Sequence, residues 1–155
     1  MQIHILAVGS RMPAWVEAAY REYARRLRGG MRLVLTEIAP GRRTRGADIA
    51  RILDEEGARL LAAVPAGSHV IALERTGRAL DTRELAAELE FRLGQGRDLA
   101  LLIGGPEGLS GECLRRADQA WSLSRLTLAH PLVRVVLAEQ LYRAWSIIHR
   151  LPYHR

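Results

Sequence analysis

The stretch LLIGGPEGLS, residues 101–110, runs from an apolar segment into a turn with three glycines. Such turns often bind phosphate, but a nucleotide P-loop needs a lysine and a serine or threonine at fixed positions that this stretch does not provide. Pro106 removes one backbone donor and restricts Gly105 to extended conformations. We expect a rigid wall, where Gly104 and Gly105 lack side chains and so let a bulky ligand approach the main chain. A tight exit from a strand is the plain structural alternative.

A second segment, LSRLTL, alternates leucines with mainly hydroxyl-bearing residues: Leu123, Ser124, Arg125, Leu126, Thr127 and Leu128. Aliphatic side chains beside free backbone N–H and C=O groups suit an adenine ring, because the ring stacks on them while its edge bonds the main chain. His130 follows this segment and is a candidate proton acceptor. Its position just before Pro131 also fits a structural role at the start of a helix.

The final residues, PYHR, combine three side chains that suit an RNA-modifying site. Tyr153 can stack on a base, His154 can accept a proton, and Arg155 can bind a phosphate or a base carbonyl. The alternative is a frayed end of the chain with a stray aromatic residue. No metal is expected, because the five histidines fall at no metal-ligand spacing and Cys113 is the only cysteine. A buried filler is the favoured role for Cys113.

The net charge of +6 comes entirely from arginine, because the chain contains no lysine. Arginine suits phosphate and base recognition, although a bias in coding composition explains the same pattern. The irregular loop PGRRTRGAD, residues 40–48, presents Arg42 and Arg43 as candidate contacts to an RNA backbone. Arg134 and Arg143 are candidate RNA contacts on a later helix, with an i,i+4 pair between Glu139 and Arg143 as the plain alternative.

Apolar runs of strand length alternate with segments of helical period, which is typical of an α/β fold with a mainly parallel sheet flanked by helices. Strands are predicted at 3–8, 32–38, 69–74, 99–104 and 120–124, and helices near 13–27, 47–63, 82–93, 110–117 and 131–148. Residues 1–155 are expected to form one domain, because no linker divides them. No membrane role is indicated, and the first residues fit a strand better than a signal peptide, so a cytoplasmic protein is expected.

The last predicted helix, residues 131–148, is apolar around most of its circumference. Such a helix must be buried on more than one side, either inside the domain or against a second copy of the chain. In a domain of this size, the pattern favours a homodimer interface.

The segments AVGSRMPAWV, LLIGGPEGL, WSLSRLTLAHPLVRVVLAEQLYRAWSI and PYHR together resemble the RlmH family of the SPOUT methyltransferase superfamily, over essentially the whole chain. The resemblance implies S-adenosylmethionine-dependent methylation of N3 of a pseudouridine in large-subunit (23S) ribosomal RNA, by a homodimer acting on assembled ribosomes. It also implies a SPOUT-type α/β fold with a C-terminal trefoil knot, which general connection rules alone would not suggest.

The resemblance further assigns the cofactor to three loops of this chain. These are the exit of the third strand at Leu73, the turn at Gly104 and Gly105, and the segment from Leu123 to Leu128. It places Tyr153, His154 and Arg155 at the active site, near the seam between two protomers. The glycine turn would then border the methyl donor rather than a phosphate.

Two alternatives remain open at this point. A non-catalytic RNA-binding or ribosome-associated factor would use the same arginines without any cofactor. A Rossmann-like enzyme for another nucleotide is disfavoured, because GSRMPAW, not G-x-G-x-x-G, follows the first strand.

Overall fold

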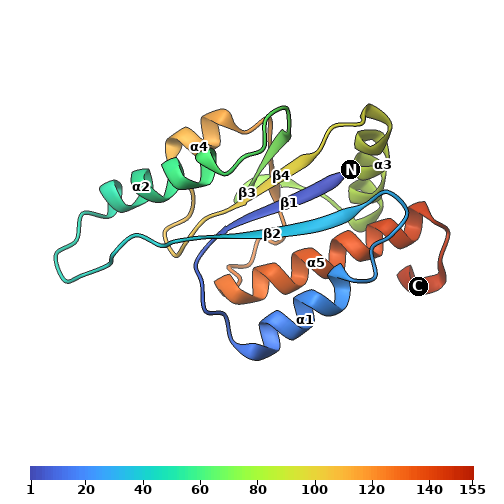
Figure 1. The fold of residues 1–155 in the computed structure, drawn as a ribbon, viewed down its shortest axis with the longest axis horizontal. Helices are drawn as coiled ribbons and strands as arrows, with labels where there is room; N and C mark the ends of the chain where they lie inside the picture. The colour runs from blue at the N-terminus through green and yellow to red at the C-terminus, as the bar shows by residue number, and fades with distance from the viewer.

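The computed structural model describes residues 1–155 and contains one sheet of five parallel strands in the order β2-β1-β4-β3-β5 (Figure 1). The strands are β1 (Gln2–Val8), β2 (Arg32–Ile38), β3 (His69–Ala79), β4 (Leu99–Ile103) and β5 (Gln119–Ser122). The helices are α1 (Ala14–Ala24), α2 (Ile49–Ala62), α3 (Thr82–Gln95), α4 (Gly111–Arg116) and α5 (His130–Ile148), followed by a short 3₁₀ helix, η1 (Pro152–His154). The predicted α/β class with a parallel sheet flanked by helices is confirmed.

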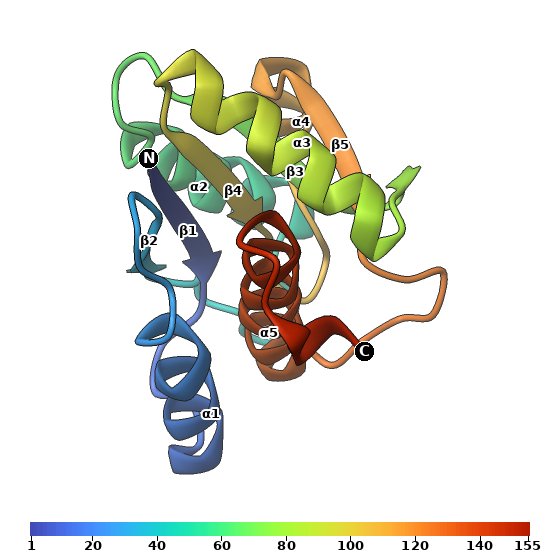
Figure 2. The ribbon, with the colours of Figure 1, turned by 90° about the vertical axis from the view of Figure 1, so that its right-hand side faces the viewer.

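The helices cover both faces of the sheet, because successive residues of a strand point to opposite sides. Ile3 and Ile5 of β1 lie in the core beneath α1, α3 and α5, whereas Leu6 and Val8 lie in the core beneath α2 and α4. On the first face, α5 packs between α1 and α3 (Figure 2). All five residues of β4 are buried, as expected for a central parallel strand.

Side-chain caps fix where several helices begin. Asp81 and Glu84 form a reciprocal capping box at the start of α3, as the sequence signature D-x-x-E favours. Asp48 caps α2, and Ser110 caps α4 by accepting a hydrogen bond from the N–H of Cys113. The Ser110 cap fixes the end of the glycine turn that precedes it.

Strand β3 extends further than predicted, to Ala79 instead of Glu74. Its pairing with β5 is interrupted, since Leu73 and Arg78 both lie opposite Trp121. The residues between them form a bulge. Gly77 closes this bulge, because a Cβ atom there would lie 2.7 Å from the backbone carbonyl carbon of Ala120. The bulge brings the residues after Leu73 to the carboxyl edge of the sheet.

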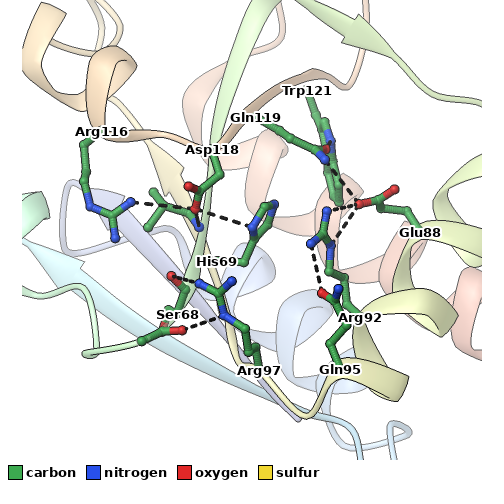
Figure 3. A network of polar contacts seen from close by, with 12 residues as sticks. Ser68, His69, Glu88, Arg92, Gln95, Arg97, Arg116, Asp118, Gln119 and Trp121 are labelled. Carbon is green, nitrogen blue, oxygen red and sulfur yellow. Dashed lines mark hydrogen bonds and ion pairs between the residues drawn. The ribbon is translucent and has the colours of Figure 1, made fainter.

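The opposite edge of the sheet carries a polar network (Figure 3). The Nδ1 atom of buried His69 lies 3.4 Å from Asp118, which also accepts a hydrogen bond from the N–H of Val70. Burial, with the nearby Arg92 guanidinium, holds the pKa of His69 below its ordinary value. The network ties β3 to β5 at the edge of the sheet that lies away from the carboxyl ends of the strands.

Candidate functional site

A cavity of about 600 Å³ opens at the carboxyl ends of β3 and β4. Parallel α/β sheets bind ligands at this edge, because the loops that leave the strands converge there. The lining comes from three loops and the start of α5: Leu73, Glu74, Arg75, residues 103–108, Leu123, Ser124, Leu126, Thr127, Leu128, His130 and Val133.

Most residues assigned to the cofactor lie on the lining of this one cavity, although they come from segments about 30 and 50 residues apart. They are Leu73, Gly104, Gly105, Leu123, Ser124, Leu126, Thr127 and Leu128. Arg125 is the exception. It is exposed and lines a neighbouring hollow of about 460 Å³, together with Arg75 and residues of the β3 bulge.

The glycine turn has a different physical basis from the one expected. A Cβ on Gly104 would lie 2.3 Å from the carbonyl oxygen of Gly108, inside the turn itself. A Cβ on Gly105 would meet Arg43 Nη2 at 3.1 Å and Val8 Cγ1 at 3.2 Å, on the protein side of the turn. The missing side chains thus serve the packing of the turn itself, most strictly at Gly104, while both glycines line the cavity and the approach of a ligand to their main chain stays a prediction.

The loop after β5 is held by its own hydroxyl groups. Ser122 donates a hydrogen bond to the carbonyl oxygen of Ser124 at 3.0 Å, and the Ser124 hydroxyl accepts one from the N–H of Leu126 at 2.9 Å. Arg75 of the β3 bulge donates to Thr127 Oγ1 at 3.0 Å. These bonds leave Leu126 75% exposed at the mouth of the cavity, where an apolar side chain has no packing role in the domain.

Arg43 lies behind the glycine turn and bonds two carboxylates at once. It donates to Glu56 Oε1 at 2.9 Å and Oε2 at 3.2 Å, and to Glu107 Oε2 at 3.0 Å through its Nε atom. Glu56 on α2 is 2% exposed and also accepts the N–H of Gly41. The Arg43 guanidinium lowers the pKa of Glu107, against a smaller opposing effect of burial. Arg43 therefore has two carboxylate partners within the chain that the sequence did not reveal, and its role as an RNA contact stays a prediction.

Arg134 is also not the surface residue that the sequence suggested. It is 2% exposed and donates to Glu37 Oε2 at 2.7 Å and to the carbonyl oxygen of Gly9 at 2.9 Å. A buried guanidinium that joins α5 to β2 and to the end of β1 cannot reach an RNA backbone. Its role is to fix the first turns of α5 beside the cavity.

His130 begins α5 and faces the cavity. Burial lowers the pKa of its imidazole, and the Arg134 charge acts in the same direction. The ring is therefore neutral near pH 7, which is the form that accepts a proton. Its Nε2 atom is buried and has no hydrogen-bond partner in the protein.

The two remaining arginines predicted to bind RNA differ in availability. Arg42 is exposed and makes no hydrogen bond or ion pair within the chain. Arg143 pairs with Glu139 at 2.6 Å, the i,i+4 alternative that the sequence left open, and its guanidinium lies over the ring of Tyr153.

The C-terminal tail packs back on the end of α5. The Tyr153 hydroxyl donates to Glu139 Oε1 at 3.1 Å, and its ring lies 4.5 Å from that of Tyr142, measured between centroids. Burial, assisted by Glu139, raises the pKa of Tyr153 to about 12. His154 and Arg155 are exposed. The tail thus forms a short 3₁₀ turn that packs against α5.

The tail follows the C-terminal end of α5 (Figure 1), whereas the cavity is lined by His130 and Val133 at the start of that helix. The helix has 19 residues and is about 28 Å long at 1.5 Å per residue. Tyr153, His154 and Arg155 do not line the cavity of their own chain. The structure therefore does not bring the two halves of the expected active site together within one protomer.

Seven lining residues were not assigned to the site from the sequence: Glu74, Arg75, Ile103, Pro106, Glu107, Gly108 and Val133. Glu107 lies inside the GGPEG turn, so its position in the motif was an available signal. Glu74 and Arg75 reach the cavity because of the β3 bulge, which no sequence pattern indicated.

The structure contains no group of three or more His, Cys, Asp or Glu side chains arranged to hold a metal ion. None of its helices is both long enough and apolar enough to cross a bilayer. Cys113 is fully buried, and burial raises the pKa of its thiol.

Comparison with known proteins identifies the group to which the chain is similar. Residues 1–154 match the family model described as "Predicted SPOUT methyltransferase". Proteins named ribosomal RNA large subunit methyltransferase H from Methylococcus capsulatus and Thioalkalivibrio sulfidiphilus are 56% and 57% identical to it over 155 residues. The alignments cover all of this chain and 100% and 99% of those proteins.

Solved structures share the fold at much lower identity. A methylase family protein from Neisseria gonorrhoeae has a TM-score of 0.53 at 16% identity, over 90% of this chain and 81% of its own. TrmJ from Z. mobilis ZM4 has a TM-score of 0.54 at 17% identity, over 93% of this chain and 70% of its own. With these folds and the full-length sequence matches, the chain belongs to the SPOUT methyltransferase family, in the group of the ribosomal RNA large subunit methyltransferase H proteins.

Proposed function

We propose that this protein transfers a methyl group from S-adenosylmethionine to N3 of a pseudouridine in 23S ribosomal RNA, on the assembled ribosome. The observation that supports this most is the single cavity formed by three separate loops at the carboxyl edge of the sheet, in a chain of the SPOUT family. The full-length relatives named as large-subunit ribosomal RNA methyltransferases support the choice of RNA.

The cavity residues fit an adenosine cofactor. The volume of the cavity, about 600 Å³, lies within the usual range for small-molecule sites. Leu73, Leu123 and Leu128 supply aliphatic surface for a purine ring, and the main chain of the glycine turn supplies polar groups for its edge. When bound there, S-adenosylmethionine supplies an electrophilic methyl carbon on a sulfonium.

We further propose that each site is completed by a second copy of the chain. The tail does not line the cavity of its own chain, because its anchor on α5, Glu139, lies six residues beyond the lining residue Val133, about 9 Å further along the helix axis. Leu132 of α5 is 37% exposed and Trp15 of α1 is 58% exposed, so neighbouring helices present unpaired apolar surface. A two-fold dimer that sets the α5 helices antiparallel would place the partner's tail beside the cavity.

The chain's own residues then have distinct tasks in the reaction. Tyr153 anchors the tail through Glu139 and Tyr142, which leaves His154 and Arg155 free to face the partner's cavity. The proton on N3 must leave as the nitrogen attacks, and His154 or His130 is the candidate to accept it. Arg155 stabilises the negative charge that develops on the base carbonyls. Alignment of N3 with the methyl carbon supplies the remaining rate enhancement.

Exposed arginines around the cavity mouth provide the RNA contacts. Arg42 extends from the loop after β2, while Arg75 and Arg125 line the adjacent hollow. A surface of this kind binds phosphates without reading sequence, so the shape of the ribosome would select the target.

Deleting residues 153–155 tests the proposal. We expect methylation of ribosomes to fall at least 100-fold, because the proton acceptor and the carbonyl ligand are lost. Binding of S-adenosylmethionine, measured by calorimetry, should change less than twofold. Mass spectrometry of the ribosomal RNA identifies the modified nucleotide. Full activity of the truncated protein, or a methyl group on another base, would contradict the assignment.

A mixed dimer tests whether the tail acts across the interface. Leu126→Arg places a charge at the cavity mouth at little cost to stability, since Leu126 is 75% exposed. Neither that variant nor the truncated chain should be active alone. Co-expressed together, they should recover about a quarter of the wild-type activity per dimer, because one intact site forms in half of the dimers. No recovery would mean that the tail serves its own chain.

A further inference from the structure

The wall of the cavity behind the glycine turn carries an unbalanced negative charge. One guanidinium, that of Arg43, is shared by the carboxylates of Glu56 and Glu107. Both oxygens of the Glu56 carboxylate accept hydrogen bonds from N–H groups. Both oxygens of Glu107 likewise accept from Arg43. Two negative groups against one positive group leave one negative charge.

This excess charge is directed at the ligand side. Glu56 is 2% exposed and lies beneath the turn, whereas the Glu107 side chain is 29% exposed and lines the cavity. The other charged groups on the lining nearly cancel, since Glu74 stands beside Arg75. His130 adds no charge near pH 7, because burial keeps its imidazole neutral.

We propose that Glu107 is a specificity-determining residue, which favours the cationic methyl donor over its neutral demethylated product. The inference rests on the proposed function, because it assumes that the cavity holds S-adenosylmethionine. The donor bears a sulfonium charge that S-adenosylhomocysteine lacks, and the two molecules otherwise share their groups. A carboxylate on the wall therefore stabilises the donor selectively and assists release of the product after transfer.

Arg43 has a second part in this arrangement. The Nε and Nη2 atoms of Arg43 fix the orientation of Glu107, while Glu56 neutralises part of the positive charge of Arg43. With a single carboxylate partner the guanidinium would neutralise Glu107 and the wall would carry no net charge. The buried Glu56 thus keeps Glu107 effective as an anion.

Glu107→Gln isolates the charge, because it preserves the size of the side chain and one acceptor oxygen. Calorimetry measures the dissociation constants of S-adenosylmethionine, S-adenosylhomocysteine and the cationic analogue sinefungin. The preference is the ratio of the dissociation constants of product and donor, and we expect it to be about fivefold smaller in Glu107→Gln than in the wild type. This is the effect of one charge at a few ångströms in a partly solvated site. Sinefungin should follow the donor.

Three controls make the result decisive. Glu107→Asp keeps the charge and should keep most of the preference. Glu90→Gln removes the same charge from an exposed position on α3, remote from the cavity, and should leave all three constants unchanged. In the wild-type protein, raising the salt concentration should reduce the preference, without any substitution.

Equal losses for donor and product in Glu107→Gln would overturn the inference and leave Glu107 a merely structural part of the turn. An unchanged preference would overturn it as well. Absence of any binding of S-adenosylmethionine by the wild-type protein is a separate outcome, which would overturn the proposed function itself.

Discussion

Replacing Arg43 with glutamine should lower the free energy of unfolding more than the same replacement at the neighbouring Arg42. The variant removes the charged partner of Glu56, whose side chain is 3% exposed and retains only the N–H of Gly41 as a donor. Breaking a buried ion pair from one side costs about 3–5 kcal/mol, because the remaining charge stays out of water. We expect about 3 kcal/mol, the lower end, because Glu107 is 29% exposed and becomes hydrated.

The loss of stability in Arg43→Gln should depend on pH. Arg43 lowers the pKa of Glu107 in the folded protein, so its stabilisation is present above the carboxyl pKa of the unfolded chain and is lost as the pH falls through the folded value. The difference in the free energy of unfolding between wild type and Arg43→Gln should therefore be largest at pH 7 and should shrink between about pH 5 and pH 3.

Urea unfolding followed by tryptophan fluorescence, at one fixed protein concentration, measures the free energy of unfolding. A loss of 3 kcal/mol corresponds to a fall in Tm of about 6–12 °C for a chain of this size. Arg42→Gln, one residue away on an exposed side chain, is the matched control and should stay within about 0.5 kcal/mol of wild type. A loss below 1 kcal/mol for Arg43→Gln, or a gap that widens in acid, would refute the ion-pair explanation.

Two further predictions concern Gly105 and His69. Gly105→Ala should cost about 1–3 kcal/mol in the same unfolding assay, because its Cβ would meet Val8 at 3.2 Å and Arg43 at 3.1 Å; a stable variant would mean that these neighbours move freely. Because the pKa of His69 is lowered in the folded protein, the unfolded chain binds the proton first as the pH falls, and the free energy of unfolding of the wild type falls with it. His69→Gln lacks this group, so it should lose less stability than the wild type between pH 7 and pH 5. Equal acid losses in both proteins would exclude His69 as the source.

The sheet and its helices were largely predictable, because their signals are local. The alternation of apolar runs with helical periods predicted all five strands and all five α-helices, although not the short η1, and D-x-x-E marked the start of α3 at Asp81. The β3 bulge was not predictable. It depends on the close approach of Gly77 to Ala120, a contact between residues 43 positions apart.

The residues of the site divide in the same way. The cavity segments were found through motifs, but the partners of Arg134 and Arg43 were not, because a sequence shows a charge without showing its partner. Arg134 meets Glu37 from 97 positions away, and Arg43 meets Glu107 from 64 positions away. The trefoil knot stays a prediction that comes from the family resemblance, along with the homodimer.

The length of α5 has a consequence for how this chain can vary. One inserted residue would turn the tail by about 100° around the helix axis and advance it by about 1.5 Å. In a two-fold dimer the same displacement would occur at both sites at once, and it would swing His154 away from the opposite cavity. Relatives that work in this way should therefore tolerate many substitutions along α5 while keeping the number of residues between the cavity and the tail unchanged.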